Sequence, residues 1–235
     1  MSLLTIVQHA CRRANIPVPS SVYGTSDEQV AQILSILEEE GNDLSGRHTW
    51  QSMTFEATHT TVAAESQGAI ATIASNGFRY ILNNTIYDRT EKAQISIIDG
   101  PDWQATKAVT TAGTRYYARI RGGNLIATPT PTAGNTWAFE YASWNWITSS
   151  DGSTYRQYFA DDADITLLPE SILLSGLRWR WKKEKGLEYA EDFRSYETQL
   201  AQAAARDGMK HNLNLGATPG NRYPGVLVPD GSWMT

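Results

Sequence analysis

Helical patterns at both ends of the chain, with a strand-like pattern between them, constrain the fold most. Residues 3–14 place their apolar side chains on one face at about 100° per residue, and Ser2 can cap this helix. A second helix begins at Ser26, whose spacing to Gln29 is that of a capping box. Its apolar stripe extends to Leu44. Each helix must bury one face, which a single helix cannot do alone.

Gly41 lies within the second helix, where glycine costs about 1 kcal/mol relative to alanine. We therefore expect a neighbouring helix to approach closely at this position. Glu38, Glu39 and Glu40 mostly face away from the apolar stripe, which indicates a solvated face.

The middle of the chain is rich in Thr, Ala, Ile, Tyr and Trp and has frequent Gly, Asn and Pro. Residues 115–129 predict a hairpin that turns around Gly122 and Gly123. Residues 136–148 predict a long strand whose aromatic residues do not keep one parity, which indicates a bulge. Residues 101–109 predict a short helix with proline in its first turn.

Two more helices are predicted, from near Pro169 to about Lys185 and from about Leu187 to Asp207, with Gly208 as a C-cap. The fold class predicted is α+β: a helical bundle formed from both chain ends, with a β-rich insertion and an extended C-terminal tail. The predicted domains are 1–49 (N-terminal helices of the bundle), 50–160 (β-rich insertion), 161–208 (C-terminal helices of the bundle) and 209–235 (docking tail).

The stretch LRWRWKKEKG, residues 177–186, could bind nucleic acid, lie on a membrane or pack between protein neighbours. On a helix, Leu173, Leu174, Leu177 and Trp181 share the core face. Trp179 lies nearly opposite, because residues two apart cannot share a face. We expect an adjacent subunit or the chain's own insertion to cover Trp179.

The two apolar faces argue against an interfacial membrane helix, which needs one apolar and one polar face. Three basic residues form a narrow stripe beside the core face, which leaves nucleic-acid contact as an alternative. The candidates for a subunit interface are Ile172, Gly176, Trp179, Arg178, Lys182 and Lys185.

Charge argues against a dedicated DNA-binding protein. The formal net charge is -5, with 20 Lys and Arg against 25 Asp and Glu, whereas phosphate binding needs a basic excess. Cys11 is the single cysteine, so no intramolecular disulfide can form, which fits a reducing compartment. The first residues lack the order of a signal peptide, and no apolar run reaches about 18 residues.

No catalytic, cofactor or metal site is expected. His9, His48, His59 and His211 are scattered, and none has metal-ligand spacing to another ligand. Cys11 has no obvious base beside it. A glycosidase would need two facing carboxylates, which sequence cannot place.

Asp161, Asp162 and Asp164 form the densest carboxylate cluster. They could hold a cation such as Ca²⁺, or supply negative charge ahead of the following helix. The spacing, glycine and distal glutamate of an EF-hand are missing, so we favour the second interpretation.

The C-terminal residues 209–235 show no period and are rich in Gly, Pro and Asn. Their spaced apolar residues predict docking on a partner, the alternative being a floppy terminus. The candidate anchors for docking are Leu213, Leu215, Tyr223, Val226, Leu227, Val228 and Trp233.

The order of these segments resembles the head-to-tail adaptor proteins (head completion, or tail tubular protein A-like) of short-tailed bacteriophages. The strongest local match is LPESILLSGLRWRWKKEKGLEYAEDFRSYETQLAQAAARDG, residues 168–208. Supporting matches are LLTIVQHACRRANIPVPSSVYG, EEEGNDLSGRHTWQ, YILNNTIYDRT and RIRGGNLIATPTPTAGNTWAFEY, so that most of the chain is covered. Each motif is weak alone, and their order carries the resemblance.

The resemblance implies a structural virion protein at the head–tail junction, assembled in the host cytoplasm. Its subunits would form a homo-oligomeric ring, typically twelvefold, beneath the portal protein. The C-terminal tail would dock on the portal, and the other end would receive the nozzle or tail tubular proteins and, in some members, fibres. Genome DNA would pass through the lumen as cargo, with no catalysis, no cofactor and no membrane partner.

Two other classes of protein remain open. A DNA-packaging accessory or nucleic-acid-binding virion protein would use the basic stripe of Arg178, Lys182 and Lys185. A sugar-binding or sugar-cleaving virion protein would use the Trp-rich insertion.

Overall fold

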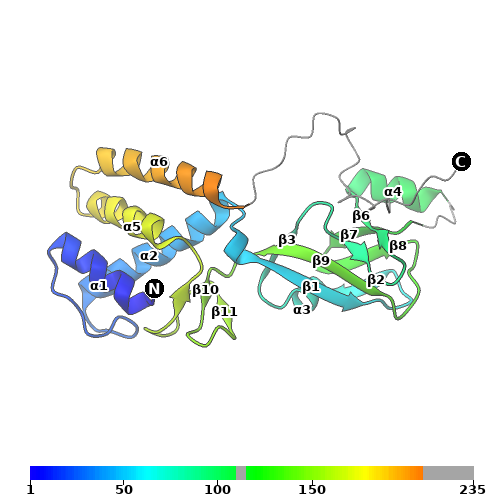
Figure 1. The fold of residues 1–235 in the computed structure, drawn as a ribbon, viewed down its shortest axis with the longest axis horizontal. Helices are drawn as coiled ribbons and strands as arrows, with labels where there is room; N and C mark the ends of the chain where they lie inside the picture. Colours follow the sequence, from blue (N-terminus) through cyan, green and yellow to red (C-terminus); the bar gives the residue numbers. More distant parts are fainter. Residues whose placement is uncertain (110–114, 209–235) are drawn as a thin grey trace, which may run out of the picture.

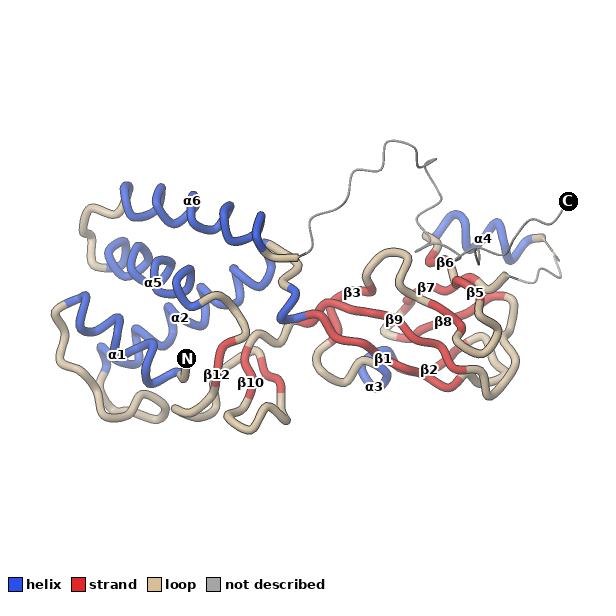
Figure 2. Tube along the Cα trace, in the orientation of Figure 1, coloured by secondary structure: helices blue, strands red, loops and turns tan. Residues whose placement is uncertain are grey.

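The longer helices gather at one end of the molecule, and most strands lie at the other together with the two shortest helices, so that the molecule is elongated (Figure 1). The computed structural model describes residues 1–109 and 115–208. The chain leaves the helical part through β1 and returns through β9, and these two strands run side by side (Figures 1 and 2).

The helices begin at residues whose side chains cap them. Ser2 accepts from Thr5 N, which confirms the cap predicted for the first helix. Asp27, and not Ser26, caps the second helix, because its carboxylate accepts from the backbone N–H groups of two residues in the first turn. The helices are α1 Leu3–Ala14, α2 Glu28–Arg47, α3 Ile70–Ile73, α4 Gly100–Ala108, α5 Glu170–Glu184 and α6 Ala190–Arg206, with a 3₁₀ turn at Gln51–Met53.

The strands of the β part form two sheets. One has the order β1-β9-β4-β5 with β3 also on β9, and the other has the order β2-β8-β7-β6. Pairing is antiparallel except between β6 and β7. These strands are β1 Thr54–Thr60, β2 Ser66–Ala69, β3 Phe78–Ile81, β4 Tyr87–Asp88, β5 Ala93–Gln94, β6 Ser96–Ile97, β7 Tyr117–Arg121, β8 Asn124–Thr128 and β9 Thr136–Ser143.

A third, smaller sheet lies beside the helices. Its order is β11-β10-β12, from Tyr155–Arg156, Ile147–Thr148 and Ile165–Thr166. Ser2 forms a bridge with Ile165, and Leu3 N donates to Asp164 O at 2.9 Å. The start of α1 is therefore tied to this sheet by the backbone.

The predicted fold class, with a helical bundle as its main element, is wrong. The described residues contain six helices and three sheets, with about 39% helix and 23% strand, which is a mixed α/β structure. The helices do not close a core by themselves, because Trp146, Ile147 and Phe159 enter it from the small sheet and its loops. The sequence did not reveal this contribution, because Trp146 and Ile147 fall within the predicted strand 136–148 and Phe159 within the predicted β-rich insertion.

A second core fills the space between the two larger sheets. Trp137, Phe139 and Tyr141 of β9 point into it together with Ile86 and Leu125. These three aromatic residues keep one parity, and β9 pairs with β1 without a register shift. The predicted bulge is therefore misplaced: the parity changes after Ser143 because the strand ends there, and the register shift occurs on β3, between Phe78 and Tyr80.

Arg79 of β3 fastens the two parts together. Its guanidinium donates to Ser45 O at 2.9 Å and to Gly46 O at 3.0 Å, both at the C-terminal end of α2. The same group lies over the ring of Trp144, 4.4 Å from its centroid. A cation at a helix C-terminus also interacts favourably with the unpaired carbonyl groups there. The arginine thus joins the β part to the helical part by charge-assisted hydrogen bonds.

Candidate functional site

The chain's own helix α6 covers Trp179, which corrects the expectation that an adjacent subunit or the β insertion would do so. The Trp179 side chain is only 8% exposed. Its ring meets Phe193 edge to face, with centroids 5.1 Å apart, and also lies near Tyr189 and Tyr196. Trp179 is therefore a core residue of the chain's own helical part.

Two further interface candidates are also buried inside the folded chain. Ile172 belongs to the helical core, and Gly176 faces the carboxylate of Glu40 on α2. A Cβ at Gly176 would overlap that carboxylate. These positions mediate helix packing within the chain, so that only Arg178, Lys182 and Lys185 of the six candidates reach the surface.

Arg180 joins α5 to α2 through three carboxylates, which the sequence did not indicate. Arg180 Nε donates to Glu40 Oε2 at 2.5 Å, and Nη2 donates to Asp43 at 3.0 Å. Its Nη1 pairs with Glu39. The expectation that Glu38 to Glu40 are solvated is wrong for Glu40, which is fully buried, and for Glu38, which accepts from Phe159 N at 3.1 Å.

Burial raises the pKa of Glu40, and this effect outweighs the opposing effects of the nearby Tyr196 hydroxyl and Arg180. Neither Glu40 Oε1 nor the Tyr196 hydroxyl makes a hydrogen bond of standard geometry to a described residue. The spacing of Glu40 could have revealed its burial, because it lies three residues after Leu37 and four before Leu44 on the apolar stripe.

The basic stripe is largely engaged by the chain itself. Arg178 Nη2 lies 3.1 Å from Asp192, and Lys182 pairs with the same carboxylate. Lys185 Nζ lies 4.4 Å from the centroid of the Trp181 ring and donates to Gln32. These contacts leave less free positive charge for phosphate than the sequence indicated.

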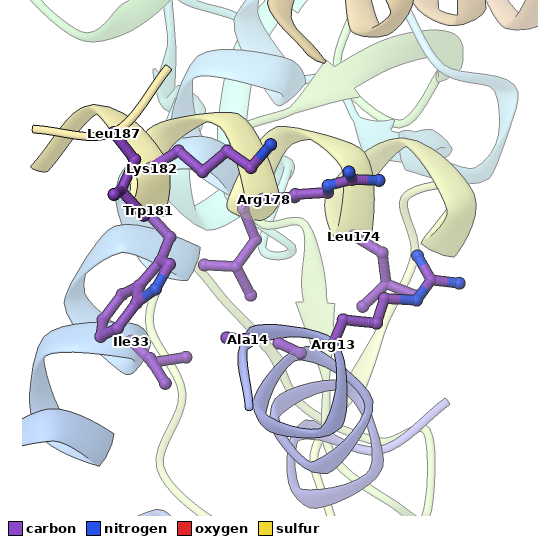
Figure 3. Close-up of a pocket in the computed structure, with 10 residues that line it drawn as sticks. Arg13, Ala14, Ile33, Leu174, Arg178, Trp181, Lys182 and Leu187 are labelled. Atoms are coloured by element: carbon purple, nitrogen blue, oxygen red, sulfur yellow. The ribbon is translucent and has the colours of Figure 1, made fainter. Parts of the chain in front are cut away.

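An apolar hollow of about 450 Å³ lies between α1, α2 and α5; we call it the groove (Figure 3). Trp181 and Ile33 lie on one side of it, and Arg13 and Arg178 on the other. Lys182 stands at its edge. The apolar lining comes from Ala14, Ile33, Leu174, Leu177, Trp181 and Leu187.

A second, more polar hollow adjoins the groove and shares Arg13, Leu174 and Arg178 with it. Arg13 makes no ion pair within residues 1–109 and 115–208. The groove thus combines an apolar floor with two guanidinium groups at one end. Sequence reasoning missed it, because Arg13 and Arg178 come from helices 165 positions apart and no local pattern relates them.

Two of the clustered aspartates, Asp162 and Asp164, bind different parts of the chain. Asp162 accepts from Val22 N at 3.0 Å and from Tyr23 N at 2.6 Å, whereas Asp164 accepts from Arg156 Nη1 at 3.1 Å and from two backbone N–H groups. Burial would raise the pKa of Asp162, but the bonds from Tyr23 and Val22 outweigh it and hold this pKa below its usual value. These carboxylates fix the loop that follows α1 and the small sheet, which is a structural role neither sequence interpretation named.

In the part of the chain that the structure describes, no group of three or more His, Cys, Asp and Glu could hold a metal ion. His9 lies on α1, His59 on β1, and His48 pairs with Asp207 at 3.1 Å. His211 lies outside the described residues, as do the predicted tail anchors Leu213, Leu215, Tyr223, Val226, Leu227, Val228 and Trp233.

Gly41 meets a ring and not a helix. A Cβ at Gly41 would overlap Trp146, whose Nε1 donates to Asn42 at 2.9 Å. The sequence predicted that a neighbour approaches Gly41 closely, but it predicted a helix, whereas the neighbour is the ring of Trp146. This contact seats the start of β10 on α2.

Neither protein-family models nor curated proteins show a match to this chain. Among the described residues, none of the helices combines the length and the hydropathy needed to cross a bilayer.

Proposed function

We propose that this protein is a structural virion protein that forms a ring beneath the portal, joins the capsid to the tail nozzle or tail tube, and lets the genome pass. The observation that carries the proposal is the resemblance of residues 168–208, together with the order of the supporting segments, to head-to-tail adaptors of short-tailed bacteriophages. The proposal includes no catalytic step and no cofactor.

The shape of the subunit supports a connecting role. Its helical and β parts lie at opposite ends and have separate cores, so each end offers a surface to a different assembly (Figure 1). Arg79 ties the two parts across the junction.

An apolar patch on the helical part supports lateral packing between subunits. Leu187 is 56% exposed, Tyr189 is 39% exposed and Phe193 is 37% exposed, and they follow one another from the turn after α5 into the first turn of α6. Exposed apolar residues that gather in one place are typical of interaction sites. A patch on one subunit that meets a different surface of the next makes a heterologous contact, which closes into a ring when the rotation allows it.

The charges favour a DNA channel over a DNA-binding protein. The net charge of -5 suits a lumen through which DNA slides, because repulsion prevents tight binding. In the basic stripe on α5, Arg178 and Lys182 pair with Asp192, and Lys185 lies over the ring of Trp181. These contacts argue against the alternative function of a DNA-packaging accessory protein.

Co-purification with the portal tests the proposed docking of the tail. Deleting residues 209–235 should abolish retention of the portal protein, and the full chain should retain it. Undiminished retention by the shortened chain would refute tail docking.

Ring formation is tested separately at the apolar patch. Leu187→Ser should reduce assembly, because it removes exposed apolar area from the contact, and Leu187 is not among the aromatic residues that cover Trp179. Tyr158→Ser is the matched control, since Tyr158 is exposed but lies away from the patch and should leave assembly unchanged. Equal assembly by both variants would argue against the patch as the lateral contact.

A further inference from the structure

The groove between α1, α2 and α5 has the chemistry of a receptor for a peptide that carries an apolar run followed by a carboxylate. Trp181, Ile33 and Leu177 supply the apolar surface. Arg13 and Arg178 supply two guanidinium groups at one end, and guanidinium groups bind carboxylates through paired hydrogen bonds. Sites that bind ligands combine an apolar lining with a few placed polar groups in this way.

Arg13 gives the groove a charge that the described part of the chain does not use. Arg178 pairs with Asp192, whereas Arg13 has no ion-pair partner in the described ranges. An unpaired arginine beside an apolar hollow favours an occupant with negative charge. Arg13 and Arg178 lie on the side of the groove opposite Trp181 and Ile33, which favours an occupant whose carboxylate lies on that side (Figure 3).

We propose that the groove binds residues 226–230 of the chain's own C-terminal segment, from the same subunit. This stretch, Val-Leu-Val-Pro-Asp, provides three apolar side chains and then Asp230, the single acidic side chain in residues 209–235. The apolar run would cover Trp181 and Leu177, and the Asp230 carboxylate would reach Arg13.

Charge separates this stretch from the apolar anchors Leu213, Leu215 and Tyr223. Leu213 and Leu215 follow Lys210 and His211, and Tyr223 follows Arg222. Positive charge beside those anchors would meet the guanidinium groups of the groove, and like charges repel.

The length of the chain beyond Gly208 permits docking within one subunit. Helix α6 begins near Leu187, a groove residue, and its 17 residues carry the chain about 25 Å away at 1.5 Å per residue. The 18 residues from Gly208 to Val226 can span up to about 60 Å when extended. Linkage to the same chain raises the effective concentration of the segment, which favours the subunit's own groove over a neighbour's.

The inference does not depend on the proposed adaptor function. If both hold, the same apolar residues serve the groove in the free subunit and the portal in the assembled one.

A disulfide trap in the full-length chain tests the proposal. Ala14→Cys places a thiol in the groove and Leu227→Cys places one in the tail, whereas the native Cys11 is fully buried. Mild oxidation of the dilute protein should give an intramolecular cross-link in most molecules. The control pairs Leu227→Cys with Tyr158→Cys, which is more exposed, at 57%, but lies outside the groove, and it should give only a low yield.

Charge variants of the trapped protein test the role of Asp230. Asp230→Arg and Arg13→Glu should each lower the rate of cross-linking by up to about fivefold, the worth of an exposed ion pair, and the two together should restore it. Cross-linking rates that neither substitution changes would overturn the proposed contact between the Asp230 carboxylate and Arg13. A yield no higher than that of the control would overturn docking itself, and cross-linked dimers or larger species would overturn docking within one subunit in favour of a second copy.

Discussion

Truncating Trp179 should destabilise the fold of the single chain. The side chain is almost fully buried against Phe193, Tyr189 and Tyr196, and Arg180 lies over its ring at 4.8 Å. A buried Trp removes about 200 Å² from water, or about 5 kcal/mol at 25 cal/mol per Å², and Trp→Ala changes in cores cost about 3–5 kcal/mol. The Nε1 atom of Trp179 is buried with no hydrogen-bond partner in the described structure. Removing this unpaired N–H group offsets the loss of unfolding free energy by about 1–2 kcal/mol.

We therefore expect Trp179→Ala to lower the free energy of unfolding by about 3 kcal/mol, which corresponds to a fall of about 6–12 °C in Tm. Thermal and denaturant unfolding of the full chain, followed by far-ultraviolet circular dichroism, measures this. Trp179→Phe keeps the aromatic contacts and loses the unpaired N–H, so it should cost about 1 kcal/mol. Trp181→Ala should also cost only about 1 kcal/mol, because Trp181 lines the open groove. Equal losses at the two tryptophans would refute the assignment of Trp179 to the core.

Arg79→Ala should cost about 2 kcal/mol and speed amide exchange at the end of α2, because two carbonyl groups lose a charged donor; unchanged exchange would contradict the junction described. Gly41→Ala should cost 1 kcal/mol or more despite the better helix propensity of alanine, since its methyl group meets the Trp146 ring, whereas Gly46→Ala on the same helix has room and should gain up to about 1 kcal/mol. A gain in unfolding free energy at both glycines would show that Trp146 does not pack there. Asp162→Asn should cost about 1–2 kcal/mol at pH 7. The pKa of Asp162 is lowered in the folded state, so its stabilisation is present above the usual carboxyl pKa and is lost as pH falls below it; a difference from wild type that persists undiminished in acid would contradict this.

The sequence predicted the caps, turns and short helices that are determined by residues close to one another in the chain. Ser2, which directly precedes the apolar pattern, caps α1 as predicted. The hairpin of β7 and β8 turns at Gly122 and Gly123, which adopt φ values of 59° and 77° that favour glycine. The helix near Pro101 is present as α4. Each of these features is decided by neighbours in the sequence.

Contacts between distant segments could not be predicted. A helical wheel places Trp179 on a face but does not name what covers that face. Trp146 lies just after a strand and packs on α2, 105 residues before it at Gly41. The fold class failed for the same reason, since the small sheet completes the helical core. Glu40 is an exception, because its position on the apolar stripe of α2 could have predicted that its side chain is buried.

The adaptor proposal depends on assembly, and electron microscopy of the purified full-length protein, alone and mixed with portal protein, tests it most directly. The account predicts closed rings seated on one face of the portal, with an open lumen. Particles that remain single subunits in both samples would contradict it.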